Sequence, residues 1–128
     1  MNVVDIRALL DRHWAASDSG DQEAEHDIYA DDVVVEYPQS GEIIRGRRNI
    51  RELRTRYPAA QRTFTVRKIT GTGDIWVTEY VLTYDGKPAY TVSIMRFEGG
   101  KVVHETQYFA DPFEAPAWRA SLVELEQR

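Results

Sequence analysis

The second half of this 128-residue sequence consists of long β-type segments in which neither face is polar. These segments cover about 63–70, 75–84, 89–98 and 101–109. They are rich in β-branched and aromatic residues, and the dipeptides Asp85-Gly86 and Gly99-Gly100 between them favour hairpin turns. A sheet with one face in water should alternate more cleanly between apolar and polar residues. The pattern therefore predicts a mainly antiparallel sheet that is covered on both faces.

The first half of the chain predicts helices. They are expected over about 3–19, over 22–29 and from Gly46 to Pro58, with a short strand at 33–37 between the second and the third. A last short helix should start at Pro116 and dock through Trp118, Leu122 and Leu125. Helices followed by strands indicate an α+β fold, and the length indicates one domain over residues 1–128.

Strand parity predicts which side chains face the interior. The expected inner set is Trp76, Tyr80, Ser93, Met95, Glu105, Gln107 and Phe109. The expected outer set is Tyr90, Val92, Ile94, Val102, Thr106 and Tyr108. An apolar outer set of this size predicts a two-fold dimer through that face, because soluble monomers rarely expose such a patch.

Composition excludes several classes of protein. A formal net charge of −5 disfavours general nucleic-acid binding, and no apolar run is long enough to span a membrane. The sequence has no cysteine, and its three histidines are not spaced as a metal site. No phosphate-binding glycine loop is present. We therefore expect a cytoplasmic protein without a metal or another cofactor, and with neither nucleic acid nor membrane as a partner.

Three strings resemble the nuclear transport factor 2-like superfamily, and within it the SnoaL-like and ketosteroid isomerase-like proteins. They are SDSGDQEAEHDIYADDVVVEYP (17–38), IIRGRRNIREL (43–53) and MRFEGGKVVHETQYFADP (95–112). The resemblance implies a cone-shaped α+β barrel, in which three helices pack in a strongly curved sheet around an apolar pocket. It also implies that the convex side of the sheet forms a dimer interface. The fold carries cyclases, isomerases, dehydratases, epoxide hydrolases and non-catalytic binders, so it does not define one activity.

Steroid isomerase chemistry is disfavoured when the residues of that family are carried over. The resemblance places Tyr37 where the isomerases have their carboxylate base, and Ser93 where they have a protonated acid. His13 stands at the position of their oxyanion-binding tyrosine. Since that reaction needs a carboxylate base, we do not expect a true steroid isomerase.

His13 and Glu105 are the candidate catalytic residues. A histidine in a dry cleft can move protons near neutral pH, and a buried carboxylate has a raised pKa. The alternatives are structural: His13 bonded to a backbone carbonyl or a tyrosine, and Glu105 paired with Arg54. Arg54 itself either binds a substrate oxygen or extends its charge into solvent. Asp111, displaced by Ala110 from the usual position after the phenylalanine, is expected to cap a loop.

The aromatic side chains predict an apolar or aromatic small-molecule ligand. Together with Arg54, the expected binding residues are Trp14, Tyr29, Tyr37, Trp76, Tyr80, Ser93, Met95, Gln107 and Phe109. The first hypothesis is a cofactor-independent isomerase, cyclase or dehydratase acting on an apolar carbonyl compound. The alternative is a non-catalytic ligand-binding or protein-interaction module on the same fold.

Overall fold

A computed structural model describes residues 5–57 and 61–126 of the chain. Within these residues the helices are α1 (Ile6–Ser19), α2 (Gln22–His26) and α3 (Arg47–Arg56), and a 3₁₀ helix, η1, covers Ala117–Leu122. The strands are β1 (Tyr29–Tyr37), β2 (Glu42–Arg45), β3 (Arg62–Thr72), β4 (Ile75–Tyr84), β5 (Lys87–Glu98) and β6 (Lys101–Ala110). The expected first residues of α1, at 3 and 4, and the expected end of α3 at Pro58 lie outside the described part.

The helix ends follow from local sequence. The Asp5 side chain accepts a hydrogen bond from the Ala8 N–H and caps the start of α1, and Asp21 does the same for α2 through the Ala24 N–H. Gly20 ends α1 in the left-handed conformation, with φ of 81°, which glycine adopts without steric cost. These local signals fix where α1 ends and where α2 begins.

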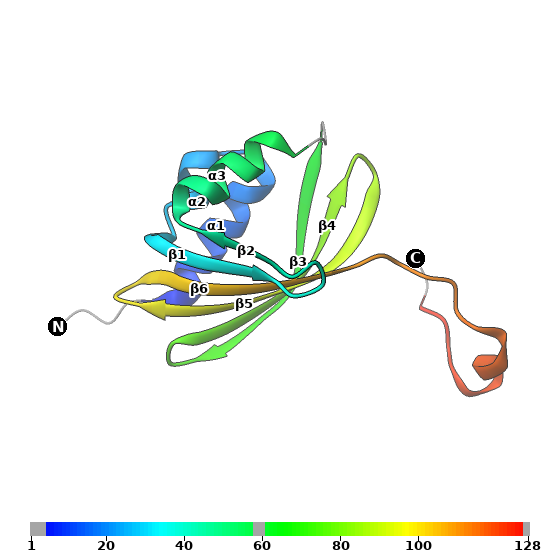
Figure 1. The fold of residues 1–128 in the computed structure, drawn as a ribbon. Coiled ribbons are helices and arrows are strands. Elements are labelled where there is room, and N and C mark those ends of the chain that lie inside the picture. The colour runs from blue at the N-terminus through cyan, green and yellow to red at the C-terminus, as the bar shows by residue number, and fades with distance from the viewer. Residues whose placement is uncertain (1–4, 58–60, 127–128) are drawn as a thin grey trace.

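The six strands of the described residues form one curved sheet in the order β2-β1-β6-β5-β4-β3. All pairs are antiparallel except β1 with β6, which are parallel. The helices lie together on one side of this sheet, which bends around them (Figure 1). This is the predicted cone-shaped α+β fold. No helix among the described residues is long and apolar enough to cross a membrane.

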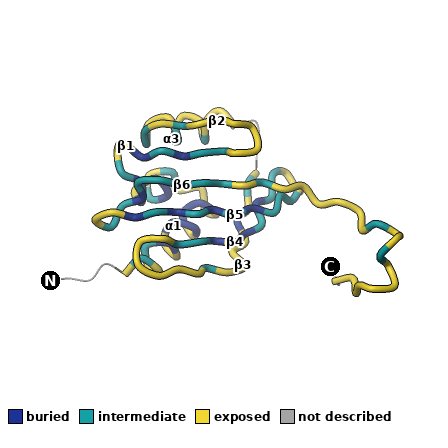
Figure 2. Tube along the Cα trace, turned by 60° about the horizontal axis from the view of Figure 1, so that its bottom comes forward, coloured by how far each residue is buried: buried dark blue, intermediate teal, exposed yellow. Residues whose placement is uncertain are grey.

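The core lies between the helices and the inner face of the sheet, where Figure 2 shows the buried stretches of the strands. Parity predicted this face correctly in β4 and β5, where Tyr80 and Met95 are buried. It was wrong at the start of β6. The register shifts between Arg96 and Phe97, so that Phe97 pairs with Val102, and Val102 is fully buried instead of facing outward. A bulge inserts one residue and reverses the parity of everything before it.

Three elements differ from the sequence prediction. The second helix ends at His26 instead of Tyr29, and β1 begins at Tyr29, earlier than the expected 33–37. The strand β2 was not predicted, because four residues carry too little periodicity. Asp31 and Asp32 lie in β1 despite their low strand propensity, in the stretch between Tyr29 and Val34 where the register of β1 with β6 is irregular.

The C-terminal segment does not dock on its own chain, contrary to prediction. Residues 111–126 extend away from the sheet (Figure 1). The side chains expected to dock, Trp118, Leu122 and Leu125, are about four-fifths exposed, at 78%, 81% and 77%. Sequence spacing shows which side chains share a face of a helix, but it does not show what that face packs against.

Candidate active site

A cavity of about 390 Å³ lies between α3 and the inner face of the sheet. The apolar wall includes Val35, Ile50, Leu53, Phe64, Leu82, Ala89 and Phe109. The polar and aromatic groups are Tyr29, Tyr37, Glu42, Arg54, Tyr57, Arg62, Tyr80, Tyr84, Glu105, Gln107 and Asp111. A cavity whose wall combines apolar and aromatic side chains with polar groups is typical of a small-molecule site.

Glu105 is a fully buried carboxyl group in the wall of this cavity. β6 places it opposite Val35 of β1 and Met95 of β5, at the middle of the sheet. Its Oε1 accepts a hydrogen bond of 2.7 Å from the Tyr29 hydroxyl. Its Oε2 is also buried and has no hydrogen-bond partner among the described residues. A buried polar atom without a partner is costly in a native protein, and it points to a functional role.

The electrostatics of the cavity favour a proton on Glu105. Burial raises the pKa of Glu105 to about 7, although the hydrogen bond from Tyr29, the nearby Ser93 hydroxyl and the positive charge of Arg54 lower it. Burial, together with the charge of Glu105, raises the pKa of Tyr29 well above its usual value. Tyr29 therefore stays a hydrogen-bond donor at neutral pH, while Glu105 can both release and accept a proton there.

Gln107, Tyr80 and Ser93 form a closed polar cluster beside Glu105. The Gln107 Nε2 donates to the Tyr80 hydroxyl and to the Ser93 Oγ, both at 3.0 Å, and these two oxygens are also 3.0 Å apart. Ser93 is fully buried and lies outside the cavity lining, so it holds Gln107 and Tyr80 in place. Tyr80 and Gln107 reach the cavity, as predicted from parity.

Tyr37 and Phe109 meet toward the end of the cavity where β1 and β6 stop. Their rings pack edge to face with centroids 5.3 Å apart. The Tyr37 hydroxyl has no hydrogen-bond partner within the described parts of the chain, and burial raises the pKa of Tyr37 above its usual value. It is therefore a protonated donor available to a ligand. Asp111, expected to be a loop cap, also lines this cavity.

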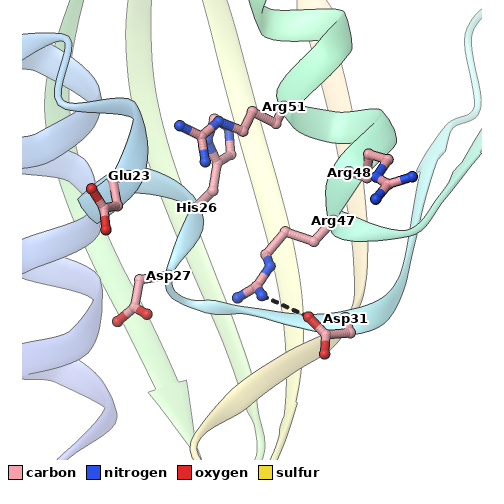
Figure 3. Close-up of a pocket in the computed structure, with 7 residues that line it drawn as sticks. All are labelled: Glu23, His26, Asp27, Asp31, Arg47, Arg48 and Arg51. Atoms are coloured by element: carbon pink, nitrogen blue, oxygen red, sulfur yellow. Dashed lines mark hydrogen bonds and ion pairs between the residues drawn. The ribbon is translucent and has the colours of Figure 1, made fainter.

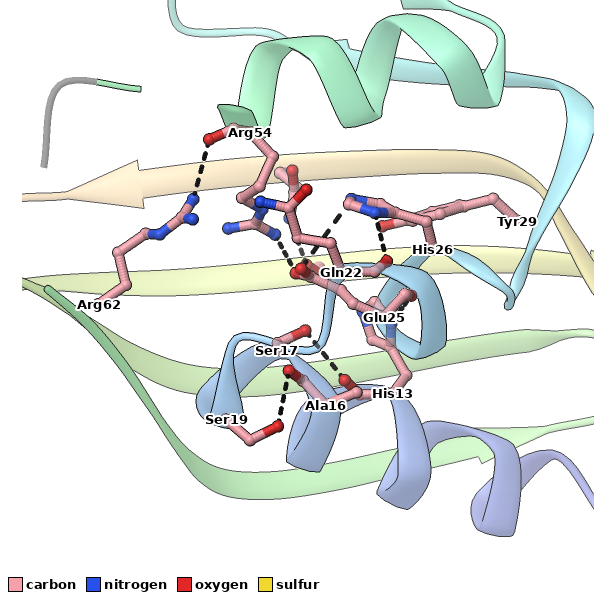
Figure 4. A network of polar contacts seen from close by, with 12 residues as sticks. His13, Ala16, Ser17, Ser19, Gln22, Glu25, His26, Tyr29, Arg54 and Arg62 are labelled. Atoms are coloured by element: carbon pink, nitrogen blue, oxygen red, sulfur yellow. Dashed lines mark hydrogen bonds and ion pairs between the residues drawn. The ribbon is translucent and has the colours of Figure 1, made fainter. Parts of the chain in front are cut away.

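Arg54 lies in the cavity wall and pairs with Glu25, not with Glu105, and it does not extend into solvent (Figure 4). Its Nη2 is 2.5 Å from the Glu25 Oε2, and the two side chains are 18% and 3% exposed. The guanidinium carbon also lies 5.2 Å from the centroid of the Phe64 ring, a cation–π distance. The ion pair ties α3 to α2 and holds a positive charge beside the cavity.

His13 is buried but does not line this cavity. Its Nδ1 is 2.6 Å from the backbone oxygen of Glu25, and its ring packs edge-on against Tyr29 with centroids 5.7 Å apart (Figure 4). Burial lowers the pKa of His13 to about 4. No hydrogen bond or ion pair joins His13 to Glu105 in the described chain; Tyr29 stands between them.

Other predicted binding residues do not line this cavity. The Trp14 Nε1 donates to the Thr78 Oγ1 at 3.2 Å, and Met95 is 1% exposed. Trp76 donates to the Gly73 backbone oxygen and covers Gly71, where a Cβ atom would lie 2.3 Å from the indole. Alternation along the strands shows which side chains share the inner face with the cavity residues. It does not show how far along the cone each side chain lies.

Sequence reasoning missed several residues of the site, and Tyr84 and Glu25 show two different reasons. Tyr84 lies on the same face of its strand as Tyr80, so the alternation along the strand could have predicted it as a cavity residue. Glu25 carried no signal, because a glutamate in a five-residue polar helix looks like a solvated one. Only the folded chain shows that Glu25 is 2% exposed.

A second hollow, of about 580 Å³, is lined by charged side chains and a histidine (Figure 3). The residues are Glu23, His26, Asp27, Asp31, Arg47, Arg48 and Arg51. Arg47 is neutralised by Asp31 at 2.6 Å, and both signs of charge are present. No group of three or more His, Cys, Asp or Glu side chains in residues 5–57 and 61–126 could hold a metal ion. The apolar cavity is therefore the better candidate site.

The raised pKa of Glu105 predicts a pH-dependent difference in stability between the protein and Glu105→Gln. Between its ordinary value of 4.5 and about 7, Glu105 binds a proton in the folded but not in the unfolded chain. The wild-type free energy of unfolding should therefore lose about 3 kcal/mol from this group as pH rises through that window. Glutamine has no such loss.

The measurement is urea unfolding of both proteins at several pH values from 4.5 to 8. Glu105→Gln should gain stability relative to wild type as pH rises. The lowered pKa of His13 acts in the opposite direction, since its contribution is lost as pH falls from 6.5 towards 4. That contribution is common to both proteins and cancels in the difference. A difference that does not change with pH would show that Glu105 titrates normally.

Comparison with known proteins agrees with this architecture. The SnoaL-like domain family matches residues 10–105. An NTF2-like protein of unknown function from Burkholderia xenovorans LB400 is 57% identical over 95% of both chains, with a TM-score of 0.86. A Kribbella flavida DSM 17836 protein provisionally named a ketosteroid isomerase is 25% identical over 96% of this chain and 90% of its own, with a TM-score of 0.85.

A third solved structure shares the fold at lower identity. IdmH from Streptomyces antibioticus, provisionally named a polyketide cyclase, is 19% identical over 83% of this chain and 92% of its own, with a TM-score of 0.68. No curated protein matches this chain. The family match covers most of the chain and includes most of α1, all of α2 and α3, and Glu105. This chain belongs to the SnoaL-like domain family of the nuclear transport factor 2-like superfamily.

Proposed function

We propose that this protein is a cofactor-independent enzyme in which Glu105 transfers a proton on an apolar carbonyl compound bound in the cavity. The observation that carries the proposal is the buried Glu105 carboxyl group, with a pKa of about 7 and an unpartnered Oε2. A group that titrates near the working pH is suited to act as both base and acid. Isomerisation, cyclisation and dehydration all use such a step.

The proposed proton transfer uses side chains that line the cavity. The ionised Glu105 Oε2 takes a proton from the carbon next to the substrate carbonyl, and the electrons move to the carbonyl oxygen. The Tyr37 hydroxyl and the Arg54 guanidinium are the donors proposed to stabilise that oxyanion. Glu105 then returns the proton to another carbon of the substrate. Tyr29 keeps the Glu105 side chain in one orientation through its bond to Oε1.

In this proposal His13 is a positioning residue. Its hydrogen bond to the Glu25 backbone oxygen fixes the segment that carries the Glu25 carboxylate, and this carboxylate holds Arg54. His13 also packs against the ring of Tyr29, which orients Glu105. His13 therefore supports the positions of Arg54 and Glu105 without a direct contact to the ligand.

A non-catalytic binding protein is the second candidate. The observation that favours it is the absence of acids at two positions where the steroid isomerases have them, which are Tyr37 and Ser93 here. The cavity alone would serve a carrier or sensor equally well. The two functions differ in whether a bound ligand is converted.

A screen of cyclic ketones, enones and polycyclic phenols should separate the two candidates. A ligand of the cavity raises the melting temperature by mass action, and an enzyme also forms product. Ala89→Phe should abolish both effects, because Ala89 lines the cavity and a phenyl ring would fill part of it. Ala110→Phe is the matched control, since Ala110 is exposed and outside the lining. Stabilisation without product across the responding ligands would favour the binding protein.

We further propose that two copies associate through the convex face of the sheet. This face consists of the outward side chains of β4, β5 and β6: Val77, Val81, Tyr90, Val92, Ile94, Thr106 and Tyr108. The helices lie on the opposite side of the sheet (Figure 1). The apolar character of both faces supports a covered convex face. Sedimentation that shows a monomer at micromolar concentration would exclude this dimer.

A further inference from the structure

Residues 111–126, the arm, carry an apolar surface that no other described residue of the chain covers. Five large apolar side chains are exposed by between 44% and 81%. They are Phe113, Trp118, Leu122, Val123 and Leu125. In the rest of the described chain such a concentration occurs nowhere within sixteen consecutive residues. Together they present on the order of 600 Å² of apolar surface.

The arm cannot hold its shape by local interactions. Its ordered part, η1, is a 3₁₀ helix of six residues without a side-chain cap hydrogen bond. Such short helices have poor hydrogen-bond geometry and are marginal in water. Within the arm, the guanidinium carbon of Arg119 lies over the Trp118 ring, 5.6 Å from its centroid. A segment of this kind becomes ordered when another surface covers it.

The arm does not pack into the cavity of its own chain, because of the direction in which it leaves the sheet. The arm begins at Asp111, in the cavity wall, and leads away from the body (Figure 1). Pro112 and Pro116 keep the residues before them extended, so a tight turn back toward the cavity is disfavoured. Pro116 itself is extended, with φ of −67° and ψ of 139°.

We infer that the arm of one copy packs against the convex face of a second copy of this chain. The arm leaves β6 at one end of this face and descends on the side of the sheet that faces away from the helices (Figure 1). Each copy has one arm and one convex face. In a two-fold symmetric dimer the same contact therefore occurs twice, and neither an arm nor a convex face is left without a partner. Two arms add roughly 1,200 Å² to the contact between the sheets, which is the range of a specific interface.

The inference depends on the dimer proposed above and is independent of the chemistry proposed for the cavity. The first test is sedimentation velocity of three proteins: the full chain, the double variant Trp118→Glu/Leu122→Glu, and the control Glu114→Gln on the same arm. Trp118, Leu122 and Glu114 are exposed, so the fold should survive in all three, which circular dichroism checks. The double variant should raise the dimer dissociation constant at least about tenfold, and the control should leave it unchanged.

The second test locates the arm. A photo-crosslinking amino acid at position 118 is introduced into ¹⁵N-labelled chain, which is mixed with unlabelled chain. Mixed-isotope cross-links to peptides of β4, β5 or β6 would support the inference. Same-isotope links alone would show that the arm returns to its own chain and would overturn it. If the double variant does not change the dimer dissociation constant, the inference about the arm is also wrong, but the dimer through the convex faces still stands. If the full chain is a monomer, both the arm contact and that dimer are wrong.

Discussion

Glu105→Gln should lower turnover at least about a hundredfold on any substrate that the cavity converts, while the fold remains intact. Glutamine keeps the shape of the side chain and can still accept the hydrogen bond from Tyr29, but it cannot take up a proton. A positioned acid or base contributes on the order of a hundred- to ten-thousand-fold in rate. The variant should also lose the rise of activity that is expected as pH passes the Glu105 pKa of about 7.

The matched control for this experiment is Glu36→Gln. Glu36 belongs to the outer face of β1, where its Oε2 lies 3.5 Å from the His104 Nε2, away from the cavity. Turnover should stay within about twofold of wild type, because an exposed ion pair contributes little. If Glu105→Gln keeps full activity on the true substrate, Glu105 is not the proton carrier. If no substrate is converted at all, the binding function takes its place.

Arg54→Met should cost about 3–5 kcal/mol of stability, the largest loss expected from a single charged residue here. The change leaves the Glu25 carboxylate buried without its cation, and Glu25 is 2% exposed. Methionine retains most of the packing against Phe64, so the loss reflects mainly the unpaired charge. Urea unfolding at neutral pH measures it directly.

Two further variants separate the charge from the packing. The double variant Glu25→Leu/Arg54→Met removes both partners and should recover most of the loss, because replacing a buried pair by apolar groups is often neutral. Arg56→Met on the same helix breaks an exposed pair with Glu52 and should cost less than about 1 kcal/mol. Equal losses of stability for Arg54→Met and Arg56→Met would show that the Glu25–Arg54 ion pair does not stabilise the fold more than an exposed pair does.

The sequence by itself determined the fold class, the sheet and most of the inner face. Period-two alternation places Tyr80, Gln107 and Phe109 on one side of their strands, and side-chain direction in a strand is a local property. The turns at Asp85-Gly86 and Gly99-Gly100 were equally local, and both adopt the positive φ that a tight hairpin needs. Helical spacing places Ile50, Leu53 and Arg54 on one face of α3, and these residues line the cavity.

What only the tertiary structure decided is which of these inward groups meet. His13 and Glu105 both point inward, yet the ring of Tyr29 stands between them, and Arg54 pairs with Glu25 from a helix that looked solvated. The single-residue bulge in β6 reversed the expected face of Val102. Periodicity gives the direction of a side chain, whereas partners depend on distances between elements far apart in the sequence. Those distances are set by how the sheet bends and by how the helices pack on one another and on the sheet.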